Sequence, residues 1–496
     1  MSSLKQLAGQ TAIYGLPSIL GRLLNYLLVP LHTYIYEKDQ FGVITEMYAY
    51  VAFLIIILTY GMETAFFRFA TNTDNKLKTY STTLLSVFST STVFIVLTSV
   101  FSVPIANFLG YPNHTEYIIW FAIIVGLDAL SAIPMARLRE QHKAKLFATI
   151  SMVNILVNIG LNLFFLVYCA NQFEAYGSSA NWLVETFYNP EIGVGYVFIS
   201  NLIATLVRTS MLLPQMIQIK PIFDHALLRK MLIYSLPLLV AGLAGIINET
   251  LDRIMIKNIL KESLGLDGAM AELGIYGACY KISIVVAIFI QAFRYAAEPF
   301  FFAKHKDGDA KEIYRDVMKY FIIVVSAIFL VIMLYIDYAM LFVGEEFRVG
   351  AAVVPILLMA NVCLGIYFNL SIWYKLTGKT IYGAGIAIGG AIITITLNYI
   401  WIPVIGYMGS AWATLICYFS MMVISYFLGQ RHYPIKYNLA KGLGYPIAVM
   451  ALYYMSTLIS QPEAPYHFLI NTVILLLFAG TILAIEKPRL TTNNSQ

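Results

Sequence analysis

The sequence predicts an all-α, polytopic membrane protein with about fourteen transmembrane helices. Three observations lead to this fold class. Hydrophobic residues make up 59% of the 496 residues and charged residues only 12%, whereas soluble domains average about 25% charged residues. The mean hydropathy is +0.74, and the apolar residues lie in runs of about 20, the length of helix that crosses a bilayer. This composition excludes a soluble enzyme and a disordered chain, because too little polar surface remains to cover a globule of this mass.

Fourteen apolar runs are predicted to form these helices. The first seven are Leu7–Pro30, Phe41–Met62, Tyr80–Ala106, Thr115–Ala136, Leu146–Cys169, Gly193–Met216 and Met231–Arg253. The second seven are Leu273–Phe302, Asp316–Phe342, Gly350–Tyr374, Ile381–Ile402, Tyr407–Gly429, Ala440–Ser460 and Tyr466–Ile485. The first run is far longer than the apolar core of a secretory signal and no small-residue cleavage site follows it, so it is expected to stay as an anchor.

The orientation of the helices follows from the basic residues in the loops. Most of the 32 Lys and Arg residues fall on one side of the predicted membrane, as in the segments Arg137–Lys145, Lys304–Lys319 and Arg431–Lys441. The positive-inside rule assigns that side to the cytoplasm and predicts that both termini are cytoplasmic. The longest loop on the other side, Ala170–Ile192, contains glutamates and no Lys or Arg. No loop reaches the roughly 50 residues of a small domain, so the chain is not expected to be an enzyme.

Short segments recur in the same order in the two halves of the chain. Ile13–Pro17 (IYGLP) recurs as Ile233–Pro237 (IYSLP), and Phe41-Gly42-Val43 with Tyr48 recurs as Leu273-Gly274-Ile275 with Tyr280. Later, Leu161-Asn162 matches Leu397-Asn398, and Gly195 matches Gly409.

Because the repeat unit is six helices, the two copies share one orientation, as in several secondary transporters. The sequence therefore predicts two six-helix lobes in a parallel pseudo-twofold arrangement around a central cavity. The predicted parts are an N-terminal lobe over residues 1–218, a basic amphipathic cytoplasmic connector over 219–230, a second lobe over 231–436, and helices 13 and 14 with a cytoplasmic tail over 437–496.

Polar and charged side chains inside the predicted helices are the candidate functional residues. A charge at mid-bilayer costs about 2.5–3.5 kcal/mol on insertion scales, so each one needs a structural or functional reason. Arg binds phosphate through two hydrogen bonds and Lys acts as a point charge, which favours a phosphate-bearing substrate. Tyr combines an apolar face with a hydroxyl and suits sugar rings. The candidate substrate ligands in the cavity are Arg22, Asn25, Glu46, Tyr48, Lys281 and Arg294, and Asp128 is the candidate ion-coupling residue.

Structural roles are the alternative for several charged residues. Arg294 and Glu298 stand four residues apart and could neutralise each other, and Asp128 could pair with a cationic residue on another helix. Arg208 could extend to the cytoplasmic interface. Glu249, Asp252 and Arg253 end the seventh predicted helix and are interpreted as a capping group with a local ion pair at the outer rim.

Motifs for catalysis, metal binding or nucleotide binding do not occur in the sequence. There is no HExxH, no GxSxG and no phosphate-binding loop of the nucleotide-hydrolase type. The four cysteines lie in or beside apolar runs without a CxxC pair. The sequence thus predicts no metal, no catalytic residue and no cofactor, and ATP-driven transport by this chain alone is not expected.

Several segments resemble one known family. The most specific are Leu228–Pro237, Asn248–Arg253 and Gly274–Tyr276, with further likeness in Phe41-Gly42, Gly61–Phe69 and Asn398–Pro403 followed by Gly406, Gly409 and Ala411. Over nearly its whole length the chain resembles the bacterial polysaccharide (O-antigen-type) flippases of the multidrug/oligosaccharidyl-lipid/polysaccharide exporter (MOP) superfamily.

The resemblance implies a secondary transporter of the bacterial inner (plasma) membrane. Such flippases move a lipid-linked oligosaccharide, usually on undecaprenyl diphosphate, from the inner to the outer leaflet by alternating access, for surface polysaccharides such as lipopolysaccharide O-antigen. Coupling to H+, Na+ or the membrane potential is expected, and the expected partners are membrane lipids and other polysaccharide-assembly proteins, with no nucleic acid. Arg22, Lys281 and Arg294 are the candidate cavity cations by helix position. In the related peptidoglycan-precursor flippases the last two of fourteen helices form a lipid groove, and helices 13 and 14 are expected to do the same.

Two other functions are considered. A cation-coupled multidrug exporter belongs to the same superfamily, but typical members have twelve spans, so the additional pair argues against that branch. A membrane glycan polymerase or ligase generally carries a large outer loop with basic or His residues, which is absent here.

Overall fold

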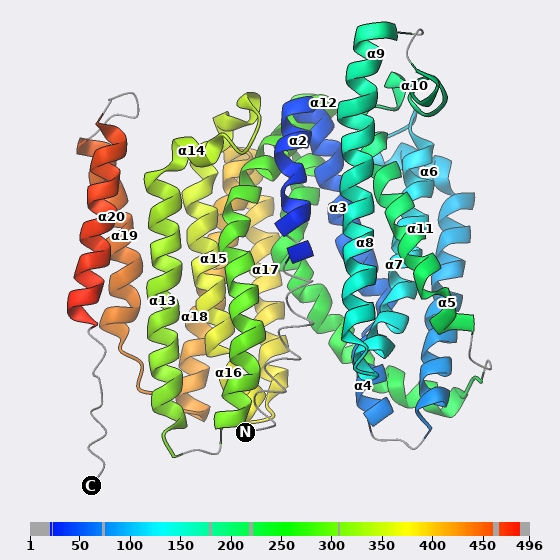
Figure 1. Ribbon diagram of the computed structural model, residues 1–496. Coiled ribbons are helices and arrows are strands. Elements are labelled where there is room, and N and C mark those ends of the chain that lie inside the picture. Colours follow the sequence, from blue (N-terminus) through cyan, green and yellow to red (C-terminus); the bar gives the residue numbers. More distant parts are fainter. Residues whose placement is uncertain are drawn as a thin grey trace. The chain divides into compact units, whose positions relative to one another are not determined.

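The computed structural model describes residues 20–21, 23–71, 75–177, 181–217, 222–305, 308–459 and 466–486 (Figure 1). These residues form helices and connecting segments, with no β-strand among them. The predicted all-α fold class is therefore confirmed. The elements before α12 are α2 (Leu28–Ile35), α3 (Lys38–Thr59), α4 (Met62–Thr71), α5 (Lys76–Val100), α6 (Ser102–Leu109), α7 (Thr115–Glu140), α8 (Ala144–Leu163), η1 (Phe164–Cys169), α9 (Ala170–Tyr176), α10 (Trp182–Phe187), η3 (Pro190–Ile192) and α11 (Gly195–Ile217).

The second half of the chain begins with the longest helical element. The elements are α12 (His225–Lys304), α13 (Ala310–Leu334), α14 (Ile336–Met340), η4 (Glu345–Ala352), α15 (Val353–Leu370), α16 (Ile372–Leu376), α17 (Thr380–Ile405), α18 (Tyr407–His432), α19 (Leu439–Ile459) and α20 (His467–Ile485).

Within the described residues, 12 helical segments are long and apolar enough to cross a membrane. One of them, His225–Phe302, contains two of the predicted helices, and the shorter apolar helix Leu23–Ile35 belongs to the predicted first helix. Most of that first helix, including Arg22, lies outside the described residues. The chain is thus a polytopic membrane protein, as predicted.

Helix α12 turns back on itself at Gly265. This residue has φ 72° and ψ 177°, which interrupts the helix and separates a first arm (residues 225–264) from a second arm (266–304). Glycine adopts this positive φ without the clash that a Cβ would cause. The Tyr276 hydroxyl donates a 2.5 Å hydrogen bond to Asp252, although 24 residues separate the two. In a straight helix they would lie about 36 Å apart, so the two arms run side by side.

Contact clustering divides the chain into two compact units, and unit 1 comprises Met1–His305 and Val343–Tyr433. In its first half α5 packs on α7, and α11 packs on both α7 and α8. In its second half α15 and α17 both pack on α18, and α12 packs on α15 and α17. The packing of α12 on α3 joins the two halves.

Two asparagines matched by the repeat make equivalent contacts. Asn162 of α8 and Asn398 of α17 are both buried. Each donates a 2.8 Å hydrogen bond from its side-chain amide to the backbone carbonyl four residues earlier, at Asn158 and Thr394 respectively. These contacts support the predicted repeat, although the copy at residues 13–17 lies outside the described residues.

Unit 2 comprises Lys306–Phe342 and Pro434–Gln496, and so contains α13, α14, α19 and α20. Helix α19 packs on α13 and on α20. The buried Asn471 of α20 links the three helices, because its amide donates to the Leu334 carbonyl and its oxygen accepts from the Ser456 hydroxyl, both at 2.5 Å. The boundaries of the units differ from those of the predicted lobes, which stay a prediction.

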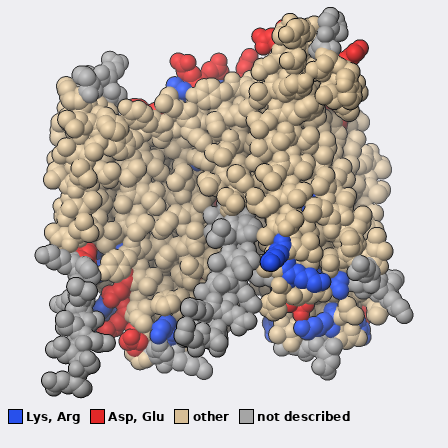
Figure 2. All heavy atoms as spheres, viewed as in Figure 1, with Lys and Arg blue, Asp and Glu red and all other residues tan. Residues whose placement is uncertain are grey.

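Charged side chains gather at the ends of the helices of unit 1. Figure 2 shows a broad uncharged band, with Lys and Arg below it beside the α4–α5 connection and acidic side chains above it at the α9–α10 end. The α9–η3 segment contributes Glu174, Glu185 and Glu191 to the acidic end. The side that faces the cytoplasm stays a prediction.

Candidate functional site: a cationic cavity in unit 1

A cavity of about 390 Å³ lies among the helix Leu23–Ile35, α3, α8, α11 and both arms of α12. Its apolar lining includes Phe41, Ile44, Val197 and Ile284. Against this background stand polar and charged side chains from all of these helices: Asn25, His32, Tyr48, Asn158, Asn162, Asn201, Glu249, Arg253, Tyr280 and Lys281. The cavity is therefore amphipathic, with two cations and one carboxylate among many neutral hydrogen-bonding groups.

Lys281 of the second α12 arm is the most unusual of these groups. Among the described residues its ammonium group makes no hydrogen bond and no ion pair. A cation held in a membrane-spanning segment is costly unless a partner offsets the lost hydration. An anionic ligand in the cavity would supply that partner.

Arg253 of the first α12 arm is held by a network of its own. Its guanidinium group donates a 2.7 Å hydrogen bond to the Glu249 carbonyl and lies 3.7 Å from the Asp252 carboxylate. It also stacks over the Tyr280 ring, 4.2 Å from the ring centroid. Asp252 in turn accepts the hydrogen bond from Tyr276, so both α12 arms fix this cation at the cavity wall.

Amide and hydroxyl groups line the wall contributed by the first half of unit 1. His32 and Asn162 are joined by a 2.8 Å hydrogen bond, and the Asn162 amide lies 3.3 Å from the Asn158 side-chain oxygen. In the same half of unit 1, Asn201 of α11 donates a 3.1 Å hydrogen bond to the Tyr48 hydroxyl of α3. Such groups can donate to and accept from hydroxyl-rich ligands.

The cavity brings together some of the predicted site residues. Asn25, Tyr48 and Lys281 line it, while Arg22 lies outside the described residues. Glu46 and Arg294 do not line it and are paired elsewhere in unit 1. The role of each in substrate binding stays a prediction.

Glu46 forms a buried ion pair near the start of α3. Its carboxylate accepts a 2.7 Å hydrogen bond from Lys257 of the first α12 arm, and both side chains are almost fully buried. The Tyr111 hydroxyl also donates to Glu46, and Tyr50 donates at 2.9 Å. Burial, and after it the Glu46 carboxylate, raises the pKa of Tyr111, which keeps this hydroxyl protonated as a donor. The ion pair joins α3 to α12. Because Lys257 is already paired with Glu46, this cluster is interpreted as structural and not as a site for an anionic ligand.

Arg294 lies on the second α12 arm and interacts with Glu298 and Phe368. It donates a 3.3 Å hydrogen bond to Glu298, which also accepts from Lys375 of α16 at 2.7 Å. The Arg294 guanidinium lies over the Phe368 ring, 4.0 Å from its centroid. The pairing with Glu298 is the structural alternative that the spacing indicated. Arg294 lines a separate pocket of about 400 Å³ with Gln291, Tyr295 and Phe302.

Asp128 of α7 pairs with Arg208 of α11, and it also accepts a 3.2 Å hydrogen bond from Thr205. The sequence left two interpretations of Asp128 open, and this interhelical pairing is one of them. It also gives Arg208 a partner in the bundle in place of the expected extension to the interface. The coupling role of Asp128 stays a prediction.

Sequence reasoning missed Arg253 and Glu249 as cavity residues. Hydropathy placed the end of the seventh helix at these charges, because a window average falls wherever charges cluster. The structure continues the helix to the turn at Gly265, so both residues lie inside the bundle. The signal that could have found them is the segment Asn248–Arg253 itself, which is one of the segments that most specifically resemble the family.

Potential metal ligands do not cluster in the described part of the chain. There, no three His, Cys, Asp or Glu side chains gather closely enough to hold a metal ion. The four cysteines are buried and unpaired as disulfides.

Comparison with known proteins identifies the family. Residues 7–305, more than half of the chain, match the sequence model of the family described as polysaccharide biosynthesis protein. No protein with a curated description matches the sequence at a significant level.

Solved structures share the fold. One described as the lipid II flippase MurJ in an inward closed conformation has a TM-score of 0.70 and 14% identity, over 95% of this chain and 99% of that chain. A multidrug resistance MATE family transporter of the MOP superfamily is similar in an inward-facing conformation, with a TM-score of 0.57 and 14% identity over 91% of this chain and 95% of that chain. An outward-facing structure described in the same terms has a TM-score of 0.56 and 13% identity over 88% of this chain and 99% of that chain. The chain therefore belongs to the polysaccharide biosynthesis protein family, and it is a multi-pass membrane protein with the fold of the MOP superfamily.

Proposed function

We propose that this protein is a secondary transporter that flips a lipid-linked oligosaccharide, on undecaprenyl diphosphate or a similar carrier, from the cytoplasmic to the outer leaflet of a bacterial inner membrane. The observation that carries the proposal is the Lys281 ammonium, which has no ion pair among the described residues, in a cavity rich in amide groups. Membership of the polysaccharide biosynthesis protein family supports it.

The chemistry of the lining suits the head of such a lipid. Lys281 and Arg253 carry the positive charge that a diphosphate needs, and Arg253 is held in place by its neighbours. Asn158, Asn162 and Asn201 offer amide donors and acceptors for sugar hydroxyls. The apolar carrier chain would stay in the bilayer, where burying it requires no protein cavity.

Movement of the head group would follow alternating access. The two halves of unit 1, joined through α3 and α12, would rock about the loaded cavity and open it to one leaflet at a time. No catalytic step is involved. A proton or sodium gradient, or the membrane potential, would supply the free energy.

A cation-coupled multidrug exporter is the second candidate, and one observation favours it. Glu249 lines the cavity, is exposed there, and forms no ion pair among the described residues. A cationic drug could use this carboxylate as its partner.

The experiment that tests the proposal is the fate of the lipid-linked oligosaccharide in a deletion strain. Spheroplasts are probed with a lectin that reaches only the outer leaflet. We expect the glycan to form but stay shielded, and to be exposed again when the wild-type chain is restored.

Complementation with point variants ties the result to the cavity. Lys281→Gln should fail to restore exposure, whereas Lys261→Gln, which removes an exposed lysine of the same helix, should restore it. Unchanged lectin exposure in the deletion strain, together with altered drug tolerance, would overturn the flippase proposal in favour of the exporter.

A further inference from the structure

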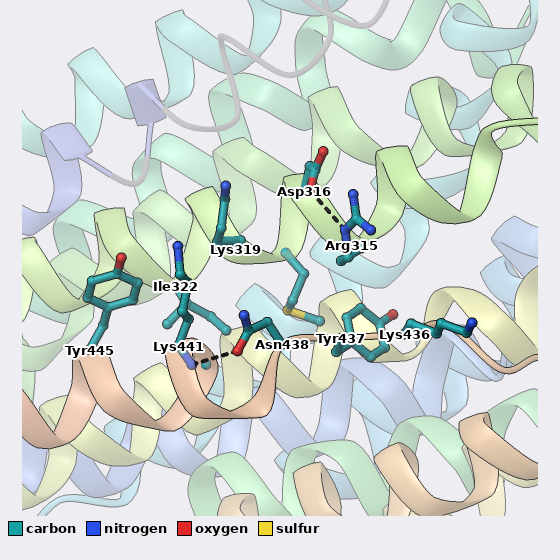
Figure 3. Close-up of a pocket in the computed structure, with 11 residues that line it drawn as sticks. Arg315, Asp316, Lys319, Ile322, Lys436, Tyr437, Asn438, Lys441 and Tyr445 are labelled. Carbon is teal, nitrogen blue, oxygen red and sulfur yellow. Dashed lines mark hydrogen bonds and ion pairs between the residues drawn. The ribbon is translucent and has the colours of Figure 1, made fainter. Parts of the chain in front are cut away.

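A separate polar pocket lies in unit 2, and none of its lining residues lines the cavity of unit 1. It has a volume of about 320 Å³ and lies between the first turns of α13 and the start of α19 (Figure 3). Arg315 and Lys319 come from α13, Lys436 and Asn438 from the segment before α19, and Lys441 from its first turn. We call this the basic pocket.

The basic pocket has more positive than negative charge. Its charged lining consists of Arg315, Lys319, Lys436, Lys441 and Asp316, and the Glu486 carboxylate borders it at the end of α20. Arg315 pairs with Asp316 at 3.0 Å. Among the described residues Lys436 makes no ion pair and is exposed.

Glu486 holds two of the lysines in place without cancelling the excess charge. Its carboxylate pairs with Lys441 and, at 2.8 Å, with Lys319, and it accepts a 2.7 Å hydrogen bond from Tyr445. Burial alone would raise the pKa of Glu486, but these donors lower it to about 2, so the carboxylate stays ionised. Each ammonium group has three N–H donors and uses only part of them here, so the others can bind an anion.

An apolar groove continues from the basic pocket along the membrane-spanning part of α19 and α20. It has a volume of about 580 Å³, and Lys441 and Tyr445 line both it and the basic pocket. Small residues of α19 make room for it, opposite large apolar residues of α20: Ala440, Gly444, Ala448 and Ala451 face Leu477, Phe478 and Ile482. We call this the tail groove.

The dimensions of the tail groove fit one leaflet of a bilayer. Its lining on α19 runs from Ala440 to Leu452, which at 1.5 Å per residue is about 18 Å. Half of the hydrocarbon core of a bilayer is about 15 Å. The charged pocket therefore stands at the depth of the head groups, and the groove reaches the middle of the membrane.

We propose that unit 2 binds an anionic phospholipid of the leaflet at the start of α13, with the phosphate in the basic pocket and an acyl chain in the tail groove. The sequence predicts that this is the cytoplasmic leaflet. Lys436 and Arg315 contact the phosphate, while Lys319 and Lys441, fixed by Glu486, donate from the other side. A zwitterionic lipid binds less well, because its ammonium group meets the excess positive charge.

The test uses the purified full-length protein and native mass spectrometry. Phosphatidylglycerol and phosphatidylethanolamine are offered together, and the fraction of protein that retains each lipid is measured. We expect phosphatidylglycerol to be retained preferentially. Removing a basic residue near the head groups weakens binding of an anionic lipid by about fivefold, the equivalent of about 1 kcal/mol. The double variant Arg315→Gln/Lys436→Gln should therefore lose about 25-fold.

Matched variants distinguish lipid binding in the basic pocket from a general effect of charge and from misfolding. Lys379→Gln removes an exposed lysine at the start of α17 in unit 1 and should leave retention unchanged. Ala448→Leu fills the tail groove and should lower retention several-fold, whereas Ala484→Leu adds the same bulk at an exposed position of α20 that does not line the groove.

Three results would overturn the proposal. They are equal retention of the two lipids, unchanged retention in both the charge and the groove variants, and complete displacement of phosphatidylglycerol by millimolar inorganic phosphate, which would indicate a site for a soluble anion. The cavity variant Lys281→Gln should keep the lipid, so a failure of the flippase proposal does not affect this test.

Discussion

Gly42 of α3 and Gly274 of α12 pack reciprocally, each against the backbone that precedes the other. A Cβ on Gly42 would overlap the Met270 carbonyl, and a Cβ on Gly274 would overlap the Lys38 carbonyl. Each carbonyl lies four residues before the glycine of its own helix. The two glycines are also matched by the internal repeat. A contact in which residue i meets j while j meets i is what a twofold axis produces, so this pair supports a pseudo-twofold axis between α3 and α12.

This glycine contact closes the helix pair at the end where α3 begins. Thr45, one turn further along α3, packs against Gly277 in the same way, and Tyr48 and Tyr280 then line the cavity. The close approach thus holds α3 and the second arm of α12 together beside the cavity, toward the end that the sequence predicts to face outward. We expect that opening the cavity at that end would require these helices to separate.

Adding a methyl group at the contact should destabilise the packing of α3 on α12. Gly274→Ala is expected to cost about 1–3 kcal/mol of stability, the usual cost of overpacking, because the obstructing atoms are backbone. Gly245→Ala on the same helix is the control, since its Cβ would meet nothing within 4 Å. Thermal unfolding of both variants in detergent measures the difference, and equal unfolding temperatures would contradict the close contact.

Lys281 should be needed for transport but not for stability. Lys281→Met removes a cation that has no ion pair among the described residues, so the unfolding temperature should stay equal or rise. Lectin exposure of the lipid-linked glycan should fall at least tenfold. Lys281→Arg, which keeps the charge, should retain part of the activity. A Lys281→Met protein that unfolds early would instead indicate a structural role.

The buried pair of Glu46 and Lys257 should respond in the opposite way. Lys257→Met leaves the Glu46 carboxylate buried without its cation, and breaking a buried pair in this way typically costs about 3–5 kcal/mol. The double variant Glu46→Gln/Lys257→Met should recover much of that loss, because no isolated charge remains. A double-mutant cycle by thermal unfolding measures the coupling, and additive effects would show that the pair is not coupled.

Asp128 provides a test of ion coupling. If this carboxylate carries the coupling ion, Asp128→Asn should abolish the dependence of flipping on the proton or sodium gradient while the protein still inserts and binds substrate. Arg208→Gln breaks the same ion pair but keeps the carboxylate, so it should retain the dependence. Flipping assays in proteoliposomes with an imposed gradient distinguish the two, and an unchanged gradient response in Asp128→Asn would remove Asp128 from the coupling step.

Glu486 should make the stability of unit 2 depend on acid pH. Its pKa is lowered to about 2 in the folded protein, against an ordinary value of 4.5. A lowered carboxyl pKa stabilises the folded state fully above about pH 4.5, and the stabilisation is lost as the pH falls towards 2. The Glu486→Gln variant should therefore be less stable than wild type at neutral pH. Its stability should also fall less than that of wild type as the pH is lowered. The exposed Glu312→Gln is the control, and thermal unfolding between pH 7 and pH 3 makes the comparison.

The sequence was sufficient for the fold class and the family. Hydropathy is a local property, and a run of about 20 apolar residues has few alternatives to a membrane-spanning helix. The paired motifs at Gly42 and Gly274 were visible because a repeat leaves the same residues at the same helix positions. Asn25, Tyr48 and Lys281, chosen as polar residues within apolar helices, line one cavity.

Only the tertiary structure decided which of the charged side chains form ion pairs. Glu46 and Lys257 are 211 positions apart in the chain, and Asp128 and Arg208 are 80 apart. Whether a buried charge meets a partner depends on which helix faces reach the same point in space, and the local sequence does not contain that information. The position of Arg253 was likewise decided by the fold. Hydropathy predicts that the helix ends at this residue, but the helix continues to the turn at Gly265, so Arg253 lines the cavity. The sequence thus indicated that Lys281 lies within a membrane-spanning helix, and the fold decided that it is left without an ion pair among the described residues.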